Sequence, residues 1–145
     1  MRQGVGILLV VGGAALAWLL KRKVGIFAHV HRPPVRVGSK NGTCGLVQPV
    51  PSVQMDRHDQ LHWMLTNTGG HCGDAVEICI TNWSPSNPLE DMDPSARPFC
   101  RRVRVGHPPL PLRARVRQGA STGNYWYHIT VDGRPAVDPM VEIVF

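Results

Sequence analysis

The four cysteines of this sequence could bind a metal, attach haem or form disulfides. None of them forms the C-x-x-C pair typical of thiolate zinc sites or the C-x-x-C-H sequence of covalently attached haem. An even number of cysteines in a small domain instead predicts two structural disulfides, with three pairings open. The disulfide candidates are Cys44, Cys72, Cys79 and Cys100.

Other metal-binding and catalytic patterns are incomplete. His29 and His31 stand two positions apart without a third ligand nearby, and the acidic run 90–93 lacks the glycine turn and ligand order of an EF-hand loop. The sequence contains no G-x-S-x-G, no H-E-x-x-H and no glycine-rich phosphate loop. A domain of about 100 residues also has little room for a deep pocket. We therefore predict a protein that is not an enzyme and that uses no metal or cofactor.

An arginine-rich segment, residues 97–117, is the most unusual stretch in composition. The side-chain alternation of strands predicts that its last three alternate arginines share one face, with two more on the matching face of the preceding strand. Like charges opposite one another destabilise a sheet, so a partner's carboxylates or phosphates would explain such a patch. The alternative, which stays open, is a solvated sheet face. The predicted partner-binding residues are Arg102, Arg104, Arg113, Arg115 and Arg117.

The charge balance of the chain bears on the class of partner. The formal net charge is +6 at pH 7, which favours an acidic protein or anionic lipid headgroups. Single-stranded nucleic acid requires aromatic side chains interleaved with the cations, and residues 101–117 contain none. We therefore predict no nucleic-acid binding.

An apolar N-terminal segment determines where in the cell the rest of the chain is located. Residues 4–20 carry no charge, and roughly 17 residues of helix span about 25 Å, at the short end for a bilayer. The small-residue pattern at 15–17 is a poor cleavage site, because large apolar residues and three cations follow it. We predict a single transmembrane anchor over residues 1–23, in contact with the lipid bilayer. Its apolar positions include Leu8, Val11, Leu16, Trp18 and Leu20.

The side of the membrane is indicated by two arguments that conflict. Lys21, Arg22 and Lys23 follow the anchor directly, and the positive-inside rule then keeps the C-terminal domain in the cytoplasm. Paired cysteines in a small β domain favour an oxidising compartment instead. We expect a single-pass membrane protein with its domain on the extracytoplasmic, periplasmic side, and the cytoplasmic side remains the alternative.

The rest of the chain is divided into short pieces by proline and glycine. We expect an extended tether over residues 24–43, where Pro33 and Pro34 force extended backbone, and a β domain over 44–145. Residues 61–67 and 75–83 are expected to form a hairpin, 84–98 a surface loop, and Asp132-Gly133 a tight hairpin turn. About seven strands without helices between them predict an all-β, antiparallel β-sandwich. The expected strands are 47–55, 61–67, 75–83, 99–105, 112–118, 124–131 and 137–145.

Two stretches carry a resemblance to known β-sandwiches. Residues 59–67, DQLHWMLTN, resemble the D-x-V-x-W-x-x-x-N strand of cupredoxins, and residues 123–127, GNYWY, resemble their G-x-Y-x-Y/F strand and equally a late strand of immunoglobulin-like folds. The resemblance implies the scaffold. It places the copper-ligating cysteine of cupredoxins at Ile129 and the following histidine at Asp132, so the type 1 copper ligands are absent.

Three functions follow as hypotheses. The first is a non-catalytic, membrane-anchored accessory or assembly subunit of a larger membrane complex, such as a respiratory or photosynthetic one, that docks through its arginine-rich sheet face. The alternative is a cupredoxin-derived metal-binding or redox domain that uses some of His71, His128, Met140 and the cysteines. The third is a ligand-binding sandwich, for instance for cell-surface glycans.

Overall fold

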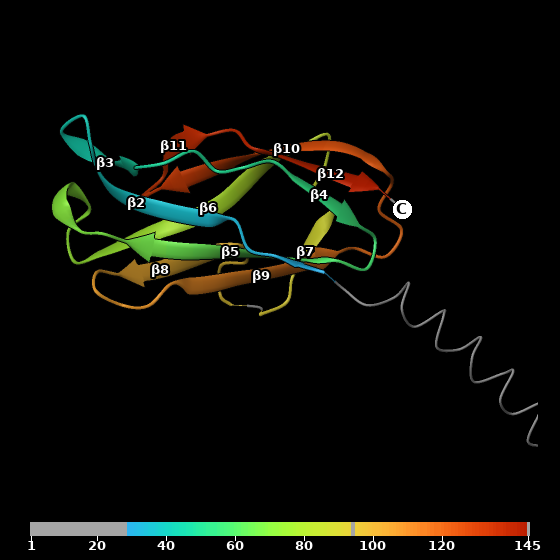
Figure 1. Cartoon of the computed structure of the whole chain (residues 1–145), viewed down its shortest axis with the longest axis horizontal. Helices are drawn as coiled ribbons and strands as arrows, with labels where there is room; N and C mark the ends of the chain where they lie inside the picture. Colours follow the sequence, from blue (N-terminus) through green and yellow to red (C-terminus); the bar gives the residue numbers. More distant parts are fainter. Residues whose placement is uncertain (1–28, 94, 145) are drawn as a thin grey trace, which may run out of the picture.

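A computed structural model describes residues 29–93 and 95–144, which form two β-sheets packed face to face (Figure 1). The all-β fold class and the sandwich are therefore confirmed. One short 3₁₀ helix, η1 (Gly70–Cys72), is the helix of the described part. The first sheet contains β1 (Val30–His31), β2 (Pro34–Lys40), β3 (Thr43–Leu46), β5 (Gln60–Asn67), β7 (Leu89–Asp91) and β9 (Leu110–Val116). The second contains β4 (Val53–Asp56), β6 (Ala75–Ser84), β8 (Cys100–Arg104), β10 (Gly123–Val131), β11 (Arg134–Val137) and β12 (Met140–Val144).

Aromatic side chains fill the centre of the space between the sheets. Trp63 of β5 and Tyr127 of β10 are fully buried, and the indole N–H of Trp63 donates a hydrogen bond of 3.0 Å to the Tyr127 hydroxyl. Trp83 and Phe99 pack against the same indole ring in edge-to-face arrangements. Because burial destabilises the phenolate, the pKa of Tyr127 rises to about 12. The hydrogen bond between Trp63 and Tyr127 therefore links the two sheets within the apolar core.

Strand order differs from the simple antiparallel sandwich. The first sheet runs β3-β2-β5-β9-β7 and the second β4-β12-β10-β6-β8, and the pairs β1/β5, β2/β5 and β4/β12 are parallel. The hairpin expected between residues 61–67 and 75–83 is wrong, because β5 and β6 lie in different sheets. Positive φ angles at Gly69, Gly70 and Gly73 let the link between them cross from one sheet to the other.

The expected tether is wrong for residues 30–40. β2 lies between β3 and β5 in the first sheet, and its Val35 and Val37 are fully buried. The extended backbone that Pro33 and Pro34 impose suits a strand as well as a linker, and the alternation of Val35 with exposed neighbours gives it an apolar face. The domain therefore begins well before residue 44. Residues 24–28 of the expected tether lie outside the described residues.

The remaining strand expectations are confirmed in part. β5, β6, β8, β9 and β10 fall where the sequence places them, and Asp132 and Gly133 form the turn between β10 and β11 with φ angles of 48° and 78°. The segments 47–55 and 137–145 each contain prolines that interrupt pairing: the first is a strand only from Val53, and the second is divided between the end of β11 and β12. The expected surface loop 84–98 contains β7, which pairs with β9.

The predicted anchor, residues 1–23, lies outside the described residues. Among residues 29–93 and 95–144, no helix is long and apolar enough to cross a membrane. The anchor stays a prediction from the sequence.

Candidate docking surface

The cysteines form two disulfides, as predicted. Cys44 is bonded to Cys72, which fastens β3 to η1, and Cys79 is bonded to Cys100 across the neighbouring strands β6 and β8. The carboxylate of Glu77 lies close to the second pair of sulfurs, but those sulfurs are bonded to each other and Glu77 accepts a hydrogen bond from Arg97. These groups therefore do not offer the free thiolates that a metal site would need.

The residues suggested for a metal or redox site are not brought together. His71 and Val131, the last residue of β10, line the same surface hollow. Met140 of β12 instead pairs with Trp126, which lies further back on β10. Five strand residues separate these positions, which corresponds to roughly 17 Å. His128 instead bonds the carboxylate of Asp138 at 3.1 Å. Ile129, at the position of the missing copper thiolate, is fully buried in the core.

His29 and His31 have a structural role at the start of the domain. The ring of His31 lies 2.9 Å from the carboxylate of Asp59, and the main-chain N–H of His29 donates to the same carboxylate. Burial raises the pKa of Asp59, but hydrogen bonds from His31 and from the N–H groups of Asp56 and His29 outweigh it, so the pKa is lowered. This carboxylate fastens β1 to the turn before β5.

One hydroxyl and imidazole pair among the described residues has the spacing of a nucleophile and a base. The Ser39 hydroxyl lies 2.8 Å from the ring of His71, but it also accepts the main-chain N–H of His71 at 2.9 Å. The hydroxyl is wedged against Gly70, where an added Cβ would meet it at 2.1 Å. No described carboxylate orients the imidazole. The pair therefore holds η1 against β2 and lacks the third member of a catalytic triad.

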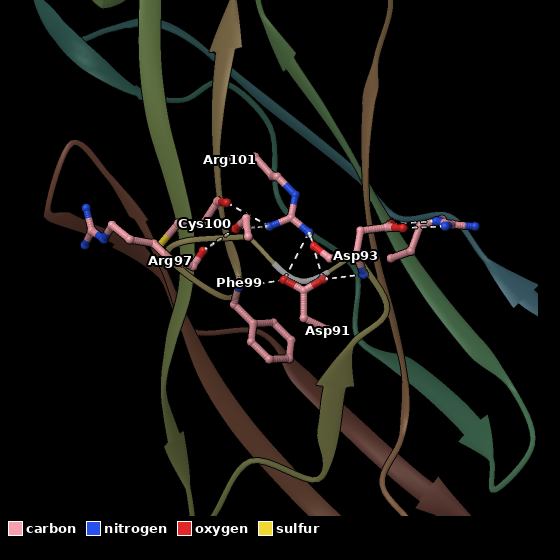
Figure 2. A network of polar contacts seen from close by, with 8 residues as sticks. Asp91, Asp93, Arg97, Phe99, Cys100 and Arg101 are labelled. Atoms are coloured by element: carbon pink, nitrogen blue, oxygen red, sulfur yellow. Dashed lines mark hydrogen bonds and ion pairs between the residues drawn. The ribbon is translucent and has the colours of Figure 1, made fainter.

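The most enclosed ion pair joins the two sheets through Arg101 and Asp91 (Figure 2). The Asp91 side chain at the end of β7 is 4% exposed and the Arg101 side chain of β8 is 13% exposed. Asp91 accepts hydrogen bonds of 2.8 and 3.0 Å from the guanidinium and of 2.9 Å each from the N–H groups of Phe99 and Asp93. Burial raises the pKa of Asp91, yet these bonds lower it more, so the carboxyl is held below its ordinary pKa.

Two predicted docking arginines, Arg113 and Arg115, lie on the outer face of β9, and the third, Arg117, directly follows its last residue. Alternation is as expected, because Leu112, Ala114 and Val116 between them are buried. Each of these arginines already has a partner within the chain. Arg113 bonds Asp93, Arg115 bonds Glu90, and the Nε–H of Arg117 donates to the carbonyl of Leu89 at 2.8 Å. The Asp93 hydrogen bond and charge also raise the pKa of Arg113.

The other two, Arg102 and Arg104, are exposed on β8, which belongs to the second sheet. The expected single flat patch of five arginines is therefore wrong, because the loop 105–109 carries the chain from one sheet to the other. Arg104 lies opposite Ala75, and Arg102 lies opposite Glu77, whose carboxylate bonds Arg97. Neither arginine forms an ion pair with any residue in the described part of the chain. Whether the five bind a partner stays a prediction.

A hollow of about 340 Å³ lies against these two arginines, and we name it the arch hollow after the loop 105–109. Beside it, Leu110 and Val105 are 37% and 39% exposed. Unpaired cations and exposed aliphatic side chains thus lie on one edge of the sandwich. Its lining residues are Arg102, Val103, Arg104, His107, Pro108, Pro109 and Leu110.

Sequence reasoning missed this division of the arginines. The acidic run 90–93 carries the charges that pair with the arginines of β9, but the sequence predicts only a surface loop over 84–98 for it. No sequence signal identifies the exposure of Val105 and Leu110, because both belong to segments with strand alternation. Their exposure follows from the change of sheet at 105–109.

Comparison with solved structures gives a distant likeness, whereas comparison of the sequence gives none. No protein family and no curated protein matches the sequence. The structure is similar to the McoA multicopper oxidase from the hyperthermophile Aquifex aeolicus, with a TM-score of 0.33 and 13% sequence identity. The match covers 79% of this chain and 29% of the oxidase, so the chain spans less than a third of that protein's length. The cupredoxin-like resemblance is confirmed only as a general likeness of strand arrangement, which bears on neither activity nor ligands.

Proposed function

We propose that this chain is a non-catalytic accessory or assembly subunit, anchored by residues 1–23, whose β-sandwich docks onto another subunit of a membrane complex. The observation that carries the proposal is the edge formed by Arg102, Arg104 and the arch hollow. Cations without counter-charges next to exposed aliphatic side chains are the combination that a protein interface covers. The other predicted arginines, two on β9 and one directly after it, serve the fold through contacts with the segment 89–93.

The two disulfides support placing the domain in an oxidising compartment, on the extracytoplasmic side. A non-catalytic role is supported by the chemistry of the described residues. Their hydroxyl and imidazole pair holds a turn, and their cysteines are bonded to one another. The pair of His31 with the buried carboxylate of Asp59 fastens β1 to the turn before β5.

Charge reversal tests the proposal. The variant Arg102→Glu/Arg104→Glu should lose its partner when the full chain is produced in its native host and purified from the membranes in mild detergent. The matched variant Arg32→Glu/Arg36→Glu reverses two arginines elsewhere on the domain and should retain it. Retention of the same partner by the first variant, with an unchanged circular dichroism spectrum, would contradict the proposal.

A further inference from the structure

Resting on the proposed function, we propose that the arch hollow binds an extended acidic segment of the partner protein, in which an apolar side chain lies between two carboxylates. The juxtaposition that points to this ligand is that Arg102 and Arg104 line the same hollow as Leu110 and two prolines.

The size of the hollow limits what can enter it. About 340 Å³ lies at the lower end of the roughly 300 to 1,000 Å³ found for small-ligand pockets. Such a space accommodates one side chain together with its flanking main chain. Pro108, Pro109 and Leu110 offer this side chain apolar contacts, and the prolines add no main-chain N–H that would require a partner. An aliphatic or aromatic residue is therefore the central anchor.

The arginines set the spacing of the charges. Arg102 and Arg104 are two positions apart on β8, so their Cα atoms are about 6.6 Å apart and both side chains point to the outer face. Carboxylates two positions apart on an extended segment have the same spacing. Arg104 lies opposite Ala75 in the strand register, whereas Arg102 lies opposite the carboxylate-bearing Glu77. Arg104 is thus the stronger of the two contacts.

The position of the hollow favours a protein over a lipid surface. Residues 30 and 60 are paired at one end of β5, and Leu65 near its other end is paired with Leu110 beside the hollow. Five strand residues separate the two ends, or about 17 Å. In Figure 1 the described chain enters at one end of the sandwich and the link between β8 and β9 lies at the other. The arch hollow therefore lies toward the end of β5 opposite to the one where the described chain begins.

Fluorescence anisotropy with labelled peptides tests this assignment on the full chain in neutral detergent micelles. The probe is a decapeptide with an Asp-Leu-Asp centre in a Gly/Ser frame, compared with Asp-Ser-Asp and Asn-Leu-Asn centres. We expect binding of the first probe, weakened about fivefold by Arg104→Gln and about tenfold by Leu110→Ser. Two exposed residues away from the hollow give matched controls, Arg134→Gln and Val47→Ser, and both should leave the affinity unchanged.

Four results would overturn the inference. The first is that the Asp-Ser-Asp peptide binds as tightly as the Asp-Leu-Asp peptide, and the second is that the control variants weaken binding as much as the test variants do. The third is that no peptide binds up to about 1 mM. The fourth is that phosphatidylglycerol displaces the probe and that Leu110→Ser does not change this displacement. The last result would assign the arginines to lipid headgroups. If the peptides fail while Arg102→Glu/Arg104→Glu still loses its partner, the proposed function stands and only this ligand is wrong. If partner binding is also unaffected, both fail.

Discussion

Replacing Asp91 by asparagine removes the negative charge from the most enclosed ion pair between the two sheets. The change keeps the side-chain volume, but it puts an amide in place of an oxygen that accepts N–H groups, and it leaves the Arg101 guanidinium, 13% exposed, without its anion. Removing one partner of a buried pair costs about 3 to 5 kcal/mol. Arg101 keeps hydrogen bonds to the carbonyls of Cys100 and Asp93, so we expect about 3 kcal/mol.

The assay is urea unfolding of the full chain with both disulfides intact. With a denaturant slope of about 1 to 2 kcal/mol per M for a small domain, the midpoint should fall by roughly 2 M. The matched control is Asp93→Asn, because the Asp93 side chain is 42% exposed and forms its ion pair with Arg113 at the surface. Solvent screens such a pair, so the control should hardly move the midpoint.

A second variant separates the lost charge from the lost packing. In Asp91→Asn/Arg101→Met the cation is removed together with its partner, and this double variant should be more stable than Asp91→Asn alone. The reasoning is refuted if Asp91→Asn is as mild as Asp93→Asn. It is also refuted if the double variant is the less stable of the two.

Three other perturbations concern different parts of the fold. Serine at both Cys44 and Cys72 opens a link across 28 residues and should lower the free energy of unfolding by about 3 to 4 kcal/mol in the same urea assay. Burial raises the pKa of Asp59, but its hydrogen bonds outweigh burial and lower the pKa below 3.8. The stabilisation from this carboxylate is therefore present above about pH 4 and is lost as the pH falls. The Asp59→Asn variant should consequently lose less stability than the parent chain when the pH is lowered. Tyr127→Phe leaves the Trp63 N–H without its acceptor and should cost about 1 to 3 kcal/mol by thermal unfolding.

Local patterns predicted the strands better than the sheets. The turn at Asp132-Gly133 and the positions of β5, β6 and β10 depend on neighbouring residues, and the sequence predicts both correctly. Membership of a sheet depends on whether a link turns back or crosses over. The glycines and η1 between β5 and β6 were interpreted as a hairpin, although their positive φ angles lead the chain across.

The candidate site shows the same limit. The alternation of Arg113 and Arg115 was predictable, but their pairing with Asp93 and Glu90 requires β7 to lie beside β9. With these two arginines paired to carboxylates, Arg102 and Arg104 on β8, in the other sheet, remain without an ion-pair partner among the described residues. A count of charges along the sequence cannot make this distinction, because segments close in sequence are separated by a change of sheet.

The central claim, that this domain docks onto a larger membrane assembly, is tested most directly on membranes that contain the native protein. They are solubilised in mild detergent and separated on a non-denaturing gel, and this chain is located by mass spectrometry. We expect migration with a large assembly, and release of the chain from it in the Arg102→Glu/Arg104→Glu variant. Migration of the parent chain alone, near its monomer mass, would contradict the account.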